Sequence, residues 1–260
     1  MMNNEHPKQD SLSYEELLRQ NQALRHDLEQ FRMQESFIWN LFAETSRKSQ
    51  VYSASIKAAV SSLLDHDIFW DNANQHEFME TIDSSVNQVS EITVLLTLAF
   101  RAQANSLVLS RDFHLLQEIL SASQTIALKK IPKIKLNISF PPEGKPVLVD
   151  YEYLTKALLL LYEVLFAQSP AEPIHVVASE TDGTWSLEFS GGSPAIMSII
   201  EQMHHCKAQP KSYEILSAEN ILRLHVMCEI LHLQQISVDV IDEPERPSIL
   251  QLRVPDIATM

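Results

Sequence analysis

Apolar residues recur every seven positions in the first part of the chain. One series joins Leu17, Leu24, Phe31 and Ile38, and a second lies four residues later in each repeat, at Asn21, Leu28, Glu35 and Phe42. This heptad pattern predicts a helix over residues 13–50 that forms a short coiled coil, in which Asn21 would favour two strands in one register. Neither glycine nor proline stops this helix before Leu64, whereas residues 1–12 predict a disordered tail.

A second helix is predicted after a loop at residues 65–74. Its apolar positions recur at spacings of three and four, at Phe78, Ile82, Val86, Val89, Ile92, Leu96 and Ala99. The two helices therefore predict an antiparallel hairpin over residues 51–104. A single hairpin buries only part of its apolar stripe, so we expect it to pair with a second copy as a four-helix bundle.

From residue 105 onward the pattern changes to alternating strands and helices. Helices are predicted at Phe113–Lys130, Tyr151–Gln168 and Ala218–Leu233, with Asp112 and Asp150 placed to cap the first two. Alternation and turn residues predict strands at Leu107–Leu109, Lys133–Phe140, Ile174–Ser179, Thr184–Phe189, Ile236–Ile241 and Ile249–Val254. Residues 105–256 thus predict an α/β sandwich, and the whole chain an α+β fold.

The composition argues against nucleic acid or a membrane as a partner. A net charge of -14 offers no broad attraction for phosphate backbones or anionic lipids. The one basic run is better explained by a helix end and a strand edge, and comprises Lys129, Lys130, Lys133 and Lys135. Because no apolar run reaches the roughly 18 to 20 residues that span a bilayer, we expect a cytoplasmic protein.

Glycine is scarce, with 4 among 260 residues, where an average protein has about 7%. A nucleotide site that brings the backbone close to phosphate through several glycines has little material here. The two cysteines, Cys206 and Cys228, provide no disulfide framework, which fits a reducing compartment.

The order of these parts resembles the cytoplasmic core of a sensor histidine kinase, over roughly residues 50–255. The stretch "HEFMETIDSSVNQVSEI" is similar to that family's second dimerisation helix, and "PVLVDYEYLTKALLLLYEVL" is similar to its strand and nucleotide-box helix. The resemblance implies a dimerisation hairpin at residues 51–104 and a catalytic ATPase-like domain of the Bergerat type at residues 105–256.

The family's phosphate-accepting motif has lost its histidine in this chain. That motif reads Ser-His-Glu-Leu-Arg-Thr-Pro-Leu, and its frame falls on "SASIKAAV", which keeps Ser53 and Lys57 but places Ala54 at the histidine. A methyl group has no nucleophilic nitrogen and cannot accept phosphate. His66 lies about 18 Å further along the helix and about 120° around it, so neither it nor His76 is a good substitute.

The nucleotide boxes that the resemblance implies have changed as well. The two asparagines that hold Mg²⁺ and phosphate fall on Leu160 and Val164, which offer no oxygen ligand. The aspartate that binds adenine falls on Ser190 or Gly191, with Gly192 as a remnant, and the last glycine-rich box falls on "NILRLHVM" around Leu222. We therefore expect no nucleotide cofactor. Glu163 stands where the family often has an acidic residue and is interpreted as a solvated rim residue.

The sequence thus predicts a catalytically inactive histidine-kinase-like scaffold, a homodimer that binds a response-regulator receiver domain or an active histidine kinase. By analogy with receiver docking in the family, the partner surface would comprise Ser53, Ala54, Lys57 and Ser61. Two alternatives stay open. One is an active kinase or phosphotransferase that uses an unrecognised histidine, and the other is a structural coiled-coil oligomeriser whose last domain binds a non-nucleotide ligand.

Several histidines and cysteines in the last third of the chain raise the question of a metal site. They are His204, His205, Cys206, His225, Cys228 and His232, of which the last three share a helix face. A helix packed on a sheet commonly buries such residues, and the paired spacing of zinc sites is missing. We predict no metal site, and we interpret Trp39, Trp70 and Trp185 as packing residues.

Overall fold

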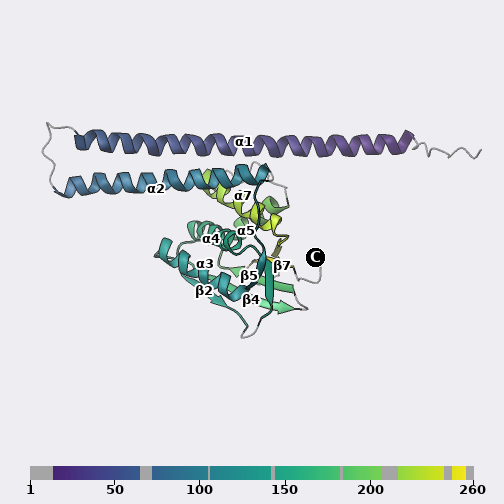
Figure 1. Cartoon of the computed structure of the whole chain (residues 1–260). Coiled ribbons are helices and arrows are strands. Elements are labelled where there is room, and N and C mark those ends of the chain that lie inside the picture. Colours follow the sequence, from purple (N-terminus) through teal and green to yellow (C-terminus); the bar gives the residue numbers. More distant parts are fainter. Residues whose placement is uncertain are drawn as a thin grey trace, which may run out of the picture. The chain divides into compact units, whose positions relative to one another are not determined.

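The computed structural model describes residues 14–64, 72–104, 106–141, 144–181, 184–205, 216–242 and 248–255 (Figure 1). The predicted tail and the side chains of His66, Trp70 and Cys206 lie outside these ranges. The chain divides into two compact units, residues 1–40 and residues 41–260. No described helix is both long and apolar enough to cross a membrane.

The first unit contains the N-terminal part of α1 (Tyr14–Leu64), which continues without a break into the second unit. The predicted helix is therefore confirmed, including its extension to Leu64. In the single chain, the heptad residues Leu17, Leu24 and Leu28 are exposed, with Leu24 at 67%. The coiled-coil partner that would cover them stays a prediction.

In the second unit, the C-terminal part of α1 and α2 (Asn72–Gln103) form the predicted antiparallel hairpin. The rings of Phe42 and Phe100 pack with centroids 4.4 Å apart, and Leu95 and Ala99 are buried. Val86, although it follows the same apolar spacing, is exposed.

The α/β part is built on a five-stranded sheet with the strand order β2-β4-β5-β7-β6. Its strands are β2 (Leu136–Ser139), β4 (Ile174–Thr181), β5 (Thr184–Ser190), β6 (Ser237–Ile241) and β7 (Ile249–Val254). The β2–β4 pair is parallel and the other pairs are antiparallel. Alternate residues such as Val176, Leu187 and Leu252 are buried on one face, as the predicted alternation requires.

Three helices contact this sheet, α3 (Leu116–Lys130), α4 (Tyr151–Gln168) and α5 (Pro194–His204), and α7 (Ala218–Leu233) packs against α4 and α5 (Figure 1). The α4 helix packs against both α3 and α7 and contacts β4, which explains why it is apolar on nearly all sides. Asp150 caps α4 as predicted, because its Oδ1 accepts a hydrogen bond from the Tyr153 N–H at 3.0 Å. The α7 helix packs against α2 as well as α4.

Some sequence predictions were wrong in their boundaries. The strand expected at Leu107–Leu109 is β1 (Asp112–Leu115), which pairs with β3 (Pro146–Val149) in a separate two-stranded sheet. As a result α3 begins at Leu116, and Asp112 accepts a hydrogen bond from the Phe113 N–H without capping a helix. The α5 helix was not predicted.

The two tryptophans in the described ranges differ in their packing. Trp185 is buried and its indole N–H donates to the Lys145 carbonyl at 3.0 Å, as expected of a packing residue. Trp39 is 60% exposed, so its interpretation as a packing residue stays a prediction.

Candidate functional site

The face of α1 around the family's acceptor position is open to solvent. Ser53, Ala54, Lys57 and Ser61 are all exposed, and the Ser53 hydroxyl donates to the Ser49 carbonyl one turn earlier at 2.9 Å. The segment from Val51 to Leu64 contains no histidine. His76, on α2, is exposed and its Nε2 lies 3.1 Å from a carboxylate oxygen of Glu80.

The positions that the resemblance assigns to Mg²⁺ and phosphate lie in the core of the α/β part. Leu160 and Val164 are each 0% exposed. Beside them, a Cβ at Gly192 would lie 2.8 Å from Leu165 Cδ2 and 3.2 Å from Met197 Cε. Hydrocarbon side chains therefore occupy the space next to that glycine.

Gly191 has a structural reason of its own to be a glycine. Its φ of 99° lies in the left-handed region, and an added Cβ would approach the Pro173 carbonyl oxygen to 2.1 Å. The residue before it, Ser190, is half-buried and ends β5. The turn after β5 thus requires a glycine whether or not a nucleotide binds.

The segment that the resemblance assigns to the last glycine-rich box forms part of α7, which packs against α2 of the hairpin. Leu222 is 0% exposed. A small cavity of about 20 Å³ marks the contact between α7 and α2 and is lined by Gln88, Glu91, Ile92, Leu95, Glu219, Leu222 and Arg223. This part of α7 therefore serves as a packing surface for α2.

Four charged side chains, which we call the charge network, connect α2, α3, α4 and α7. Glu163, on α4, forms an ion pair with Lys130 at the end of α3, and its Oε2 lies 3.1 Å from Arg223 Nε. The Arg223 N–H does not point at that oxygen, so this contact is an ion pair without a hydrogen bond. Arg223 Nη2 and Lys130 Nζ also contact Glu91 Oε1, at 3.0 and 3.1 Å.

Charge interactions outweigh burial in the charge network. Burial alone would raise the pKa of Glu91, but Arg223 and Lys130 hold this pKa below its usual value. Burial alone would lower the pKa of Lys130, but Glu163 and Glu91 hold it above its usual value. Glu91 and Lys130 are therefore both charged at neutral pH.

A second set of contacts joins α7 to α1. The Tyr52 hydroxyl donates to Glu219 Oε1 at 2.7 Å, and Lys48 Nζ lies 3.4 Å from the same oxygen. Burial, assisted by the hydrogen bond to Glu219, raises the pKa of Tyr52 to about 12, so the phenol stays a donor at neutral pH. Because Glu219 is in the first turn of α7, this helix is connected to both helices of the hairpin.

The sequence correctly predicted the environment of only some residues of the charge network. Lys130 does lie in the last turn of α3, as the interpretation of the basic run required. Glu163 was interpreted as a solvated rim residue, which was wrong because its side chain is buried between Lys130 and Arg223. An acidic residue inside the apolar run of α4 was the one signal in the sequence that a cation would lie beside this carboxylate.

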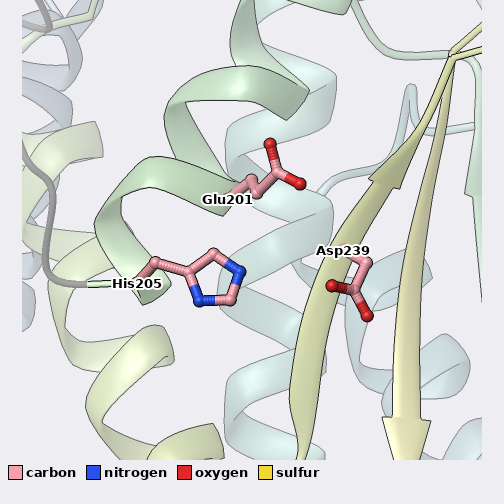
Figure 2. Close-up of side chains that lie close together, drawn as sticks. All are labelled: Glu201, His205 and Asp239. Atoms are coloured by element: carbon pink, nitrogen blue, oxygen red, sulfur yellow. The ribbon is translucent and has the colours of Figure 1, made fainter.

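The histidines and cysteine of α7 do not come together around a common point. His225 is buried, and burial lowers its pKa although Glu229 opposes that effect. Cys228 is buried, with its thiol directed at the Ile200 carbonyl at 4.0 Å, whereas His232 is exposed. The group of possible metal ligands found among the described residues is Glu201, His205 and Asp239, of which only His205 was considered from the sequence (Figure 2).

No family model matches the sequence, and no curated protein matches it. Solved structures do match. The histidine kinase AdeS of Acinetobacter baumannii has a TM-score of 0.55 at 12% identity, covering 80% of this chain and 96% of AdeS. Full-length ShkA, solved in complex with AMPPNP, has a TM-score of 0.54 at 14% identity, covering 88% of this chain and 45% of ShkA. The chain therefore has the fold of a histidine kinase core, and the predicted fold is confirmed.

Proposed function

We propose that this chain is a catalytically inactive scaffold with a histidine kinase fold, which works as a homodimer and binds two-component partners in the cytoplasm. The proposal rests on one observation, which is the chemistry of the side chains at the two sites that phosphoryl transfer requires. These are the phosphate acceptor and the nucleotide site. The resemblance assigns Ala54 to the acceptor position and Leu160, Val164 and Leu222 to the nucleotide and Mg²⁺ positions, and these three apolar residues are each 0% exposed. Phosphoryl transfer needs a nucleophile and Mg²⁺ needs oxygen ligands, and hydrocarbon supplies neither.

The contacts between α7 and the hairpin also favour a scaffold. A kinase domain that carries phosphate to a hairpin must change its position during the reaction. Here Arg223 is paired with Glu91 on α2, and Glu219 accepts from Tyr52 on α1, so such movement would break both sets of contacts. A fixed arrangement suits a binding platform because a preorganised surface loses less entropy on association.

The partner surface would lie on α1, at Ser53, Ala54, Lys57 and Ser61. These residues are exposed, and three of them have small side chains that allow a partner to approach the helix closely. Pull-down with receiver domains and active kinases encoded by neighbouring genes tests this surface. We expect Ala54→Trp and Lys57→Glu to abolish capture, while Lys133→Glu, an exposed lysine elsewhere, leaves it intact. Capture that neither α1 substitution changes would refute the proposed surface.

Homodimer formation would cover apolar side chains that the single hairpin leaves exposed. They are Val51, Val60, Leu64, Val86, Val94 and Phe100, in addition to the heptad residues of the first unit. Light scattering should give twice the chain mass of 29.6 kDa, and Leu24→Glu should reduce it. A monomeric mass at micromolar concentration would contradict the dimer.

The absence of catalysis is tested on the purified chain with labelled ATP and Mg²⁺, beside an active histidine kinase as positive control. We expect no acid-labile incorporation and no nucleotide binding by calorimetry. Incorporation would establish the alternative of an active kinase, and its loss in His76→Ala would then identify the acceptor. Magnesium-dependent binding of ATP without transfer would also contradict the proposed inactive scaffold.

One observation favours the alternative in which the last domain binds a non-nucleotide ligand. An open cavity of about 260 Å³ is lined by Leu115, Leu116, Gln117, Phe140, Pro141, Gly144, Lys145 and Trp185. Its largely apolar lining would suit a small organic molecule. A thermal-shift screen with metabolites, followed by titration of the tryptophan fluorescence in the wild type and in Trp185→Phe, would detect such a ligand.

A further inference from the structure

Glu201, His205 and Asp239 bring three potential metal ligands together at one edge of the five-stranded sheet (Figure 2). Glu201 lies on α5 and His205 directly follows its last residue, one turn further on, so both side chains share a face. Asp239 lies on β6, the edge strand beside α5. Their ligand atoms all lie within 4.8 Å of one another.

Hydrogen bonds already connect α5 to β6 and to the residue that precedes β6. The Val240 N–H donates to Glu201 Oε1 at 3.0 Å, and His204 Nε2 lies 3.0 Å from the Ile236 carbonyl oxygen. The first bond orients the Glu201 carboxylate and leaves its second oxygen for another partner. These hydrogen bonds therefore hold the potential metal-ligand atoms close together in the absence of an ion.

The charges around the group favour a cation. Two carboxylates and an imidazole converge, and Arg253 Nη1 lies 3.8 Å from Asp239 Oδ2. That ion pair is long and largely exposed, so it offsets little of the repulsion between the carboxylates. A divalent ion between them would interact with both.

We propose that Glu201, His205 and Asp239 bind one divalent transition-metal ion of the Zn²⁺ class, with water completing its coordination. One imidazole nitrogen and two carboxylate oxygens suit Zn²⁺, or Co²⁺ in its place, better than Ca²⁺ or Mg²⁺, which prefer oxygen ligands alone. The bound ion would join the end of α5 to the edge strand and stabilise the folded α/β part. This inference concerns the α/β part alone and is independent of the proposed scaffold function.

The test is calorimetric titration of the metal-free full-length chain with ZnCl₂, accompanied by thermal unfolding. We expect one Zn²⁺ per chain and a higher unfolding temperature. His205→Ala and Asp239→Asn should each weaken binding at least about tenfold. Both variants keep Glu201 and its bond to Val240, and circular dichroism of the metal-free proteins checks that they fold.

His76 and Glu80 on α2 provide a matched control. They form the same pair one turn apart, exposed and 3.1 Å from each other, and the described residues add no third ligand. His76→Ala should therefore leave Zn²⁺ binding unchanged. Equal affinity in the wild type, His205→Ala and Asp239→Asn would overturn the site, as would loss of binding in His76→Ala or no binding at millimolar Zn²⁺. An equally strong response to Mg²⁺ would overturn the assigned class of metal.

Discussion

Arg223 Nη2 on α7 lies 3.0 Å from Glu91 Oε1 on α2, and the same guanidinium lies 3.1 Å from Glu163 Oε2 on α4. A single arginine therefore contacts carboxylates from the hairpin and from the core of the α/β part. Arg223 belongs to the segment that the resemblance assigns to a glycine-rich nucleotide box. In this chain, an arginine of that segment connects the hairpin to the α/β part through its two ion pairs.

Removing the charge of Glu91 should destabilise the protein. In Glu91→Gln, Arg223 and Lys130 lose one of the two carboxylates that compensate for their partial burial. We expect the free energy of unfolding to fall by about 1 to 3 kcal/mol, below the cost of breaking a fully buried pair. Urea denaturation measures it, and Asp83→Asn, at an exposed carboxylate on the same helix, should change it by less than about 0.5 kcal/mol. Equal effects of the two substitutions would show that the charge network adds no stability.

The contribution of Glu91 should depend on pH. Its folded-state pKa lies below the ordinary value of 4.5, so its stabilisation is fully present above pH 4.5 and is lost as the pH falls through the lowered pKa. The difference in unfolding temperature between wild type and Glu91→Gln should therefore shrink between about pH 5 and pH 2. Lys130 acts in the opposite sense, because its raised pKa means that its contribution disappears only as the pH rises beyond 10.5. A difference that stays constant through the acid range would contradict this assignment.

Leu160 should behave as a core residue. It is fully buried on α4, so Leu160→Ala removes buried methyl groups and leaves a cavity. We expect a loss of about 2 to 5 kcal/mol in the free energy of unfolding. Leu128→Ala on α3, where the leucine is exposed, is the matched control and should cost under about 1 kcal/mol. A small effect at Leu160 would indicate that the space around it is open enough for a ligand.

The two adjacent glycines should respond differently to alanine. Gly191→Ala forces a side chain into the left-handed region and against the Pro173 carbonyl, which is backbone and cannot move aside easily. Gly192→Ala meets the ends of the Leu165 and Met197 side chains, which can shift. We expect about 3 kcal/mol or more of destabilisation for the first and about 1 kcal/mol for the second, measured by chemical denaturation. The reverse order would mean that Gly192, not Gly191, is the glycine the fold requires.

Much of the fold could be predicted from the sequence because periodicity is a local property. The spacing of apolar residues identified α1 and α2, alternation identified β2, and capping and turn residues located α4, β4 and β5. The errors fall where pairing between segments that are distant in the sequence determines the secondary structure. The β1 strand exists because it pairs with β3, and Leu116 begins α3 because the residues before it belong to that pair.

At the candidate sites, the residue types alone fix which chemistry the side chains offer. The methyl group of Ala54 and the hydrocarbon of Leu160 and Val164 have the same reactivity in any fold. Tertiary structure alone decided which charges meet, because Glu91 and Arg223, or His205 and Asp239, are far apart in the chain and become neighbours only through packing. A charged residue in a helical pattern looks the same whether it faces water or an opposite charge, so these contacts could not be read from the sequence.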